Sequence, residues 1–438
     1  MILFYSHILS ERLKYIVTVL LTEQLGLTVH FTNHLDDLKN EHQPAILYGK
    51  VNGEFKNALQ VRAQGLLEED HIQNQDIKVN NYCSLTEINK RIPAFFQSDD
   101  GDFAFDLFAS SFYLLSRYEE YLPHTKDSYG RFPHEDSLAF QHGFLHRPLI
   151  HEWLSDFVFL LKNKFPNLNI QRPAFRMQIS YDIDQAWSYR GKGFIRSIGG
   201  LLKNPSLQRI KVLLGMANDP FDVFEKWMKY HVENKTPGIF FFPTNLKHGK
   251  YDKNTFFKYK PYQSLIQKLN ESQQIGLHPS WRSGDFSNEL QTEKTRLENL
   301  IHQPVKQSRQ HYIRLHIPET YRLLNQVGIE KEYSMGYGSI NGFRASFADQ
   351  FPWFDLPNNQ TTQLRIYPFS FMDANSKYEQ KQTAEITLEE IKMYFKTTQE
   401  VGGIFVPIFH NFMTNQSAEN KSWYAVYAWL TTQIPSSV

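Results

Sequence analysis

Short apolar runs alternate with amphipathic segments over the second half of the chain. Seven runs enriched in aromatic and β-branched residues predict strands, at residues 175–182, 238–243, 274–279, 305–310, 330–335, 363–369 and 402–411. Five segments with helical periodicity separate them, at residues 221–234, 262–270, 288–301, 319–328 and 388–401. Strands that alternate with helices in this way form a parallel sheet or barrel, so an α/β fold is predicted for this half.

The first half mixes amphipathic helical segments with short strand-like pieces such as residues 45–51, which predicts a smaller α+β domain. A polar tract with Pro166 and Pro173 follows it, and polar stretches that contain proline commonly mark domain boundaries. We therefore expect two domains, over residues 1–170 and 171–438, with one enlarged barrel as the alternative.

The most distinctive stretch of the first half is an aromatic helix followed by a polar loop. Phe105, Phe108, Phe112 and Leu115 recur at helical spacing, which predicts a helix with a buried aromatic face. Charged residues follow at the end of this helix and in a loop that contains glycine: Arg117, Glu119, Glu120, Asp127 and Arg131. They are interpreted either as buried ion pairs or as contacts to a ligand.

Composition excludes several classes of protein. The 47 basic and 46 acidic residues nearly balance, which argues against a dedicated nucleic-acid binder. Cys83 is the only cysteine, so any metal must be held by histidine and carboxylate side chains. No apolar run is long enough for a transmembrane segment, and the N-terminal stretch lacks the cleavage pattern of a signal peptide. We expect a soluble, cytoplasmic protein, and the sequence leaves its oligomeric state open.

Polar side chains follow several of the predicted strands directly. They are Asp182 and Asp184 after the first strand, His278 after the third, Arg309 and His311 after the fourth, and His410 after the last. In parallel α/β folds, catalytic groups lie at the carboxyl ends of the strands. This placement predicts an active site at that end of the sheet.

The residues after the early strands allow a structural interpretation beside a functional one. Asp182 and Asp184 are two positions apart and project to one face of a strand, where a cation can separate their charges. A solvated turn or a helix cap is the alternative for this pair. His278 is interpreted as a metal ligand, as an acid/base group, or as a core histidine bonded to a backbone carbonyl.

The later part of the chain extends the candidate set. Arg309 or His311 is able to reach the mouth of a barrel, and Arg344 is placed to pair with a site carboxylate or to bind a polar substrate. Both arginines also fit a structural ion pair. His410 and Asn411 end a strongly apolar strand, which packing alone does not explain, so His410 is predicted to act as a general acid.

A basic segment over residues 188–220 separates the first two predicted strands. We interpret it as a lid, as a contact to a phosphorylated or lipid-linked sugar or an anionic membrane surface, or as a solvated capping helix.

At these residues the chain resembles the polysaccharide deacetylase family, also called the NodB-homology family. The run SYDID, residues 180–184, is similar to a first motif in which an aromatic residue precedes an acidic pair. The resemblance covers residues 170–435 and implies a distorted (β/α) barrel with seven strands. Residues 105–121 and 308–346 resemble an intracellular bacterial branch in which an uncharacterised N-terminal domain precedes a divergent deacetylase domain.

The resemblance implies a role for each candidate residue. Asp182 matches the catalytic base, His410 the general acid, and Arg309 the arginine of the family's third motif. Arg344 joins the predicted catalytic set outside the resemblance, from its position after Gly342 alone. Asp184 matches the acid that binds the metal, and His278 the first histidine of a His-x-x-x-His motif. Arg282 stands at the second histidine position of that motif, so His311 from the next strand becomes the candidate for the third ligand.

The implied cofactor is a divalent metal, with zinc as the first choice, and the implied substrate is an N-acetylated sugar or glycan. The implied reaction hydrolyses the carbon–nitrogen bond of the acetamido group without a nucleophilic serine. The alternative, motivated by Arg282, is a catalytically inactive deacetylase-like barrel that binds a glycan or a partner protein. A carbohydrase would need a second carboxylate opposite Asp182, and the later strand ends predicted from the sequence offer none.

Overall fold

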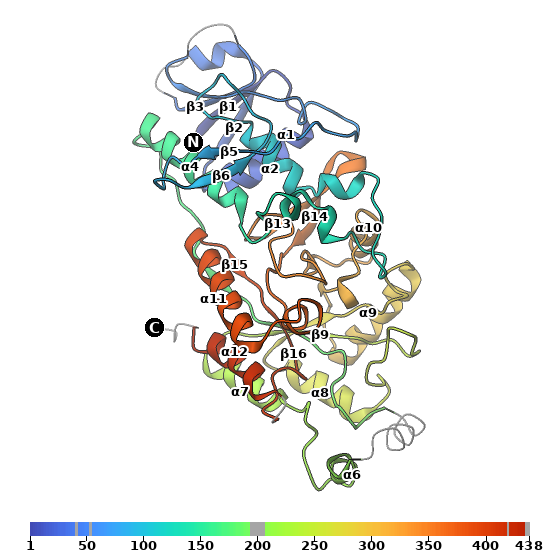
Figure 1. Ribbon diagram of the computed structural model, residues 1–438. Coiled ribbons are helices and arrows are strands. Elements are labelled where there is room, and N and C mark those ends of the chain that lie inside the picture. Colours follow the sequence, from blue (N-terminus) through green and yellow to red (C-terminus); the bar gives the residue numbers. More distant parts are fainter. Residues whose placement is uncertain (40–42, 52–54, 193–205, 418–419, 434–438) are drawn as a thin grey trace.

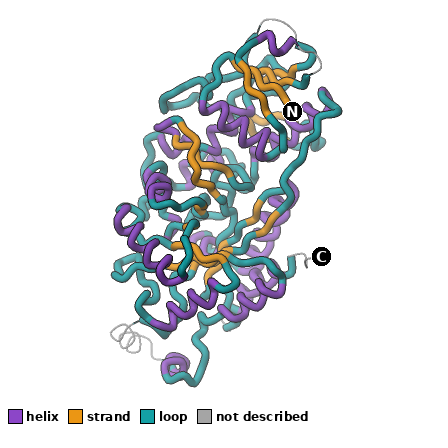
Figure 2. Tube along the Cα trace, turned by 180° about the vertical axis from the view of Figure 1, so that it is seen from behind, coloured by secondary structure: helices purple, strands orange, loops and turns teal. Residues whose placement is uncertain are grey.

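A computed structural model describes residues 1–39, 43–51, 55–192, 206–417 and 420–433 of the 438-residue chain. The molecule is elongated: the strands of the first half lie at one end and α6 (Leu207–Leu213) lies at the other, in both views (Figures 1 and 2). The middle of the basic segment, residues 193–205, falls outside the described residues. No helix in the described ranges combines the length and the apolar character that crossing a membrane requires.

The main sheet of the first half has four strands in the order β2-β1-β3-β4, all parallel. These strands are β1 (Ile2–Ser6), β2 (Val29–Thr32), β3 (Ala45–Tyr48) and β4 (Ala58–Val61), and a separate antiparallel pair joins β5 (Asn80–Cys83) to β6 (Arg91–Ala94). A wholly parallel main sheet differs from the α+β arrangement that the sequence predicted. Short apolar runs indicate that strands form, but the direction of pairing depends on the crossover between them.

The described residues of the first half form the helices α1 (Glu11–Val17), α2 (Leu107–Leu115), α3 (Leu138–Gln141) and α4 (Leu149–Lys164). The helix α2 contains Phe108, Phe112 and Leu115 of the predicted aromatic helix, whereas Phe105 precedes it, and all residues of α2 are buried. It begins where the carboxylate of Asp106 accepts a hydrogen bond from the backbone N–H of Ala109 at 2.9 Å. The hydroxyl of Tyr48 donates to the same carboxylate at 2.7 Å, which fastens α2 to the sheet.

The main sheet of the second half has eight strands in the order β13-β14-β12-β11-β10-β9-β8-β16. Their bounds are β8 (Ser180–Asp182), β9 (Ile239–Phe242), β10 (Gln274–Leu277), β11 (Gln307–Ser308), β12 (Lys331–Glu332), β13 (Phe351–Asp355), β14 (Gln360–Ile366) and β16 (Ile408–His410). Neighbouring strands are parallel except for β13 and β14, and a second parallel pair joins β7 (Arg176–Met177) to β15 (Ile404–Phe405). The parallel α/β architecture predicted from the sequence is confirmed.

Each of the seven predicted runs contains a strand, and β13 is an additional one. This strand pairs antiparallel with β14 at the edge of the sheet and contains Pro352, which an edge strand tolerates. At the opposite edge, Ile408 of β16 forms a parallel bridge with Met372, beyond the end of β14. The chain after β14 therefore returns to the far edge of the sheet, while a closed barrel of seven strands stays a prediction.

Helices follow the strands of the second half, as the alternating pattern predicted. They are α7 (Phe224–Glu233), α8 (Lys260–Asn270), α9 (Ser287–Ile301), α10 (Glu319–Gln326), α11 (Ala384–Val401) and α12 (Lys421–Thr431). The first five correspond to the five predicted helical segments. The last, α12, packs beside α11 (Figure 1).

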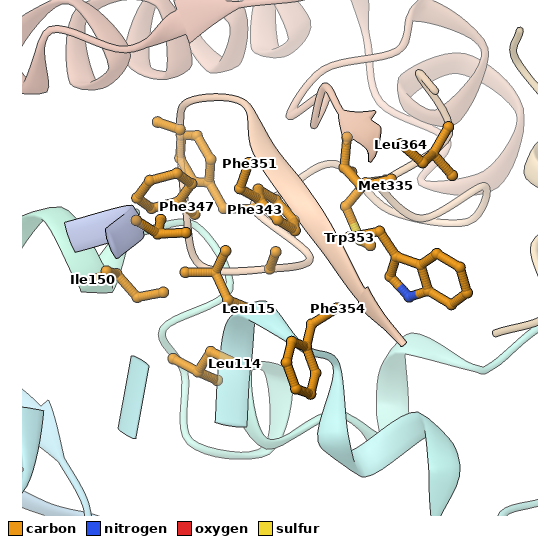
Figure 3. Close-up of a cluster of buried hydrophobic side chains, with 14 of the residues drawn as sticks. Leu114, Leu115, Ile150, Met335, Phe343, Phe347, Phe351, Trp353, Phe354 and Leu364 are labelled. Carbon is orange, nitrogen blue, oxygen red and sulfur yellow. The ribbon is translucent and has the colours of Figure 1, made fainter. Parts of the chain in front are cut away.

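One apolar core runs through both halves (Figure 3). Leu114, Leu115 and Ile150 of the first half belong to the same buried cluster as Phe343, Phe347, Phe351, Trp353 and Phe354 of the second half. The ring of Phe354 lies 5.0 Å from that of Tyr15 and 5.2 Å from that of Phe112, measured between centroids. The first half is thus joined to the edge of the larger sheet by buried aromatic contacts, and a boundary near residue 170 stays a prediction.

Candidate active site

The carboxyl ends of the parallel strands bring the predicted polar residues to one pocket. Asp182 and His410 are paired in register on the neighbouring strands β8 and β16, and His278 directly follows β10. The pocket has a volume of about 290 Å³, and its lining includes Asp182, Asp184, His278, His311 and His410. The structure therefore brings together five of the seven residues that the sequence proposed for the site.

Asp184, His278 and His311 form a group with the composition of a metal site. The Nε2 atoms of His278 and His311 lie 3.2 Å and 3.5 Å from Oδ1 of Asp184. One ligand atom from each residue lies within 4.8 Å of the other two. Because β10 and β11 are adjacent parallel strands, the residues that follow them reach the same point, and His311 stands beside His278 without a second histidine in the loop after β10.

Hydrogen bonds orient both imidazoles toward Asp184. Nδ1 of His278 lies 2.7 Å from the backbone carbonyl of Arg309, which can only accept, so Nδ1 carries the proton. Nδ1 of His311 lies 3.2 Å from Oδ1 of Asp252. In both rings Nε2 then faces the carboxylate of Asp184. A carbonyl or carboxylate behind a histidine is the usual means of fixing the tautomer of a metal ligand.

The donor set fits a divalent cation. Oδ1 of Asp184 is buried and, within the described part of the chain, accepts no hydrogen bond of normal geometry. Burial raises the pKa of Asp184, but His311 and then His278 and His410 lower it by more, so the carboxylate stays ionised. Two imidazole nitrogens and one carboxylate oxygen form a three-ligand set of the kind that catalytic zinc uses, with further positions left open.

Asp182 is held by an arginine behind the pocket. Nη1 of Arg309 donates to Oδ1 of Asp182 at 2.9 Å, and its Nη2 donates to the hydroxyl of Ser180 at 2.9 Å. Arg309 is fully buried, and its guanidinium lies 4.5 Å from the centre of the Phe241 ring. Arg309 therefore positions Asp182 and neutralises its charge, while Asp182 itself lines the pocket.

His410 is held by a carboxylate that was not among the residues predicted from the sequence. Nδ1 of His410 lies 2.6 Å from Oδ1 of Asp373, and the backbone N–H of His410 donates to the other carboxylate oxygen at 2.8 Å. Burial lowers the pKa of His410, but Asp373, together with Asp184 and Asp182, raises it by more, to about 9. Its Nε2 faces the pocket, 4.0 Å from Oδ2 of Asp184. Asp373 follows the apolar run that ends at Met372, so the strand-end pattern contained a signal for it.

Asp252 gave no comparable signal in the sequence. It lies in the loop between β9 and α8, and its carboxylate accepts hydrogen bonds from the backbone N–H of Trp281 at 2.9 Å and 3.2 Å while it contacts His311. Its place behind His311 follows from the folding of that loop over the strand ends.

Arg344 and Arg282 lie away from the group of ligands. Nη2 and Nε of Arg344 donate to the two carboxylate oxygens of Glu120 at 2.6 Å and 2.9 Å, and Glu120 also accepts from Arg117 at 2.7 Å. Among the described residues that line the pocket, Arg344 is absent. Of the three interpretations of Arg344, the structure shows the structural ion pair, because the loop after β12 turns this side chain toward the first half. Arg282 is exposed and pairs with Glu289 at 2.7 Å.

The buried ion pair predicts a large effect of Arg344 on stability. Arg344→Ala removes one of the two arginine partners of the buried Glu120, with Arg117 as the other, and is expected to lower the free energy of unfolding by about 2–3 kcal/mol. The control Arg282→Ala breaks an exposed pair and should change it by ~1 kcal/mol or less. Urea unfolding of both variants measures the difference. An Arg344→Ala protein of unchanged stability would show that the ion pair contributes little.

Comparisons with known proteins leave the family of the whole chain open. A model described as "Family of unknown function (DUF7033)" matches residues 2–166, which is less than half of the chain. No curated protein matches the chain.

Several solved structures resemble parts of the chain. One is a Mycobacterium smegmatis protein provisionally described as a polysaccharide deacetylase, with 12% identity and a TM-score of 0.40 over 60% of this chain and 85% of that one. A polysaccharide deacetylase from Bacillus cereus has 12% identity and a TM-score of 0.29 over 59% of this chain and 89% of that one. A CE4 family pseudoenzyme from Bacillus anthracis has 7% identity and a TM-score of 0.29 over 59% and 66%. These scores are too low to carry a function over to this chain.

Proposed function

We propose that this chain is a metal-dependent hydrolase that removes an acetyl group from an N-acetylated carbohydrate. The observation that carries the proposal is the arrangement around one pocket of three distinct units. These units are the ligand group Asp184, His278 and His311, the arginine-held carboxylate Asp182, and the carboxylate-held imidazole His410. Hydrolysis of an amide requires a polarised carbonyl, a base for water and an acid for the departing amine, and the three units match these needs.

A divalent cation, with zinc as the first choice for this donor set, would supply polarisation of the amide carbonyl and a lower pKa for an attacking water. Asp182 accepts the proton of that water, and Arg309 keeps the carboxylate oriented for this step. His410 donates a proton from Nε2 to the nitrogen of the departing amine, and Asp373 stabilises the imidazolium that precedes the transfer. The products are acetate and a free amino sugar.

The choice of an acetamido sugar as the substrate rests on the resemblance of residues 180–184 to the deacetylase motif and on the carboxylate–imidazole arrangement. The rival interpretation is a catalytically inactive barrel that binds a glycan or a partner protein. It was motivated by Arg282, which stands where the family motif has a second histidine. That interpretation requires the third metal ligand to be absent, but His311 lies where this ligand is needed. The geometry therefore favours the hydrolase.

The test is acetate release in the presence and absence of metal. We expect the zinc-loaded protein to release acetate from at least one member of a panel of N-acetylated mono- and oligosaccharides. Treatment with a chelator should abolish the release, because the ligand group then holds no cation, and added zinc should restore it. Elemental analysis of the same samples should give about one metal ion per chain. A chain that binds no zinc, cobalt or nickel, and releases no acetate, would leave the binding role as the better interpretation.

A further inference from the structure

A loop of the first half enters the candidate active site. Tyr129 and Arg131, which follow α2 in the chain, line the same pocket as Asp182, Asp184 and His410. The carboxylate of Asp127 accepts hydrogen bonds from the backbone N–H groups of Tyr129 and Arg131 at 2.9 Å and 2.8 Å and from Nε of Arg131 at 2.7 Å. The loop is therefore internally braced in the conformation that presents Tyr129 to the pocket.

Contacts with the second half hold this loop against the site. Nη1 of Arg131 donates to the backbone carbonyl of Tyr312 at 2.8 Å. Gly338 faces the same guanidinium, and a Cβ at position 338 would lie 2.0 Å from Nη1 of Arg131. Only glycine allows the arginine to approach so closely. At the edge of the pocket, Gly338 of the second half thus leaves space for the side chain of Arg131 from the first half.

Tyr129 stacks on Tyr312, the residue that follows the candidate metal ligand His311 in the chain. The rings of Tyr129 and Tyr312 are 5.4 Å apart, with an angle of 18° between their planes. Tyr312 follows His311 directly, has a φ of 59° and is 38% exposed. A left-handed conformation is strained at a tyrosine, and such strain is typical of functional positions. The backbone here turns the ring toward the pocket and the solvent rather than into the core.

The two tyrosines belong to a larger aromatic wall. Tyr251 and Trp281 stack at 3.8 Å with an angle of 18°, and the ring of Trp281 lies 6.2 Å from Tyr129 and 6.0 Å from Tyr312. All four rings are at least partly exposed. Aromatic rings with polar tips suit a surface that is apolar on one side and wet on the other, and the flat C–H faces of pyranose rings pack on such rings while their hydroxyl groups stay solvated.

We propose that Tyr129 and Tyr312 form a subsite for a sugar ring next to the one that is deacetylated, and that the first half thereby selects oligosaccharides over monosaccharides. This inference rests on the proposed function for the position of the reacting sugar. The subsite gives the first half a direct part in substrate recognition, because the loop with Tyr129 and Arg131 lines the edge of the pocket.

The experiment compares a linear tetrasaccharide of N-acetylglucosamine with the N-acetylglucosamine monosaccharide. Binding is followed by isothermal titration calorimetry, and turnover by acetate release. Wild type should bind the tetrasaccharide at least about tenfold more tightly than the monosaccharide. Tyr129→Ala should remove that preference and raise KM for the tetrasaccharide about tenfold, with kcat and bound zinc unchanged. Tyr129→Phe retains the ring and should behave like wild type, as should Phe159→Ala, which changes an exposed ring on α4.

Binding and turnover distinguish the two proposals. A preference for the tetrasaccharide that Tyr129→Ala abolishes supports the subsite even if no acetate is released, and in that case the proposed hydrolysis fails. Acetate release from both sugars with equal efficiency, unchanged in Tyr129→Ala, supports the hydrolysis and overturns the subsite. Absence of tetrasaccharide binding to wild type also overturns the subsite.

Discussion

Asp184→Ala, His278→Ala and His311→Ala are each expected to lose stoichiometric zinc. Each variant removes one of three donors whose ligand atoms lie within 4.8 Å of one another, and two donors leave a cation too weakly held to survive purification. Elemental analysis after dialysis measures the loss. In wild type, zinc at 100 times its dissociation constant should add about 2.7 kcal/mol to the free energy of unfolding, an effect that the variants should lack.

The decisive member of this set is His311→Ala. Arg282→Ala is its matched control, because Arg282 occupies the motif position where the resemblance places a second histidine, yet its guanidinium points to Glu289. Arg282→Ala should keep its zinc and the accompanying stabilisation. If His311→Ala retained one zinc with wild-type affinity while Arg282→Ala lost it, the assignment of the third ligand would be wrong.

His410→Ala is expected to lower kcat by about 10²- to 10⁴-fold while bound zinc is retained, because a positioned general acid contributes that much to a reaction. The histidine lines the pocket but lies outside the group of three ligands, so its removal should separate catalysis from metal binding. Asp182→Asn should lower kcat to a similar extent by removing the base. Acetate release at saturating substrate, with zinc content measured on the same protein, gives both quantities.

The control for His410→Ala is His302→Asn, which changes an exposed histidine at the end of α9 and should leave kcat unaltered. A His410→Ala protein with wild-type kcat would remove His410 from the mechanism and leave the source of the amine proton to be found elsewhere in the pocket. A His410→Ala protein without zinc would instead show that this imidazole supports the ligand group.

The sequence predicted the parts of the site that depend on strand ends. Asp182, Asp184, His278 and His410 each follow or end an apolar run, and parallel strands carry such residues to one edge, so position along the chain was enough. Their partners depend on distant pairing. Asp373 lies 37 positions from its partner His410, and Arg309 lies 127 positions from its partner Asp182. Only the folded sheet shows which carboxylate pairs with which basic side chain.

Arg309 and Arg344 show why some assignments could not be made from the sequence. Both were candidates to bind a carboxylate, and both do, but one holds Asp182 and the other holds Glu120 from the first half. No local pattern distinguishes an arginine behind a pocket from one at a contact between two halves. Tyr129 was missed for a related reason, since the charged residues of its loop stand out in the sequence, but no local pattern places that loop at the carboxyl ends of the strands in the other half.

The aromatic contact between α1, α2 and β13 limits how the two halves of this chain can diverge in evolution. Phe354 lies against both Tyr15 and Phe112, and the hydroxyl of Tyr15 donates to the backbone carbonyl of Pro352, 337 positions away in the chain. In a close-packed interior, a change in the size of one ring leaves a void or a clash unless its neighbours change as well. Changes of side-chain volume at these distant positions are therefore expected to be energetically coupled, and exchange of the first half for an unrelated one would require β13 to repack as well.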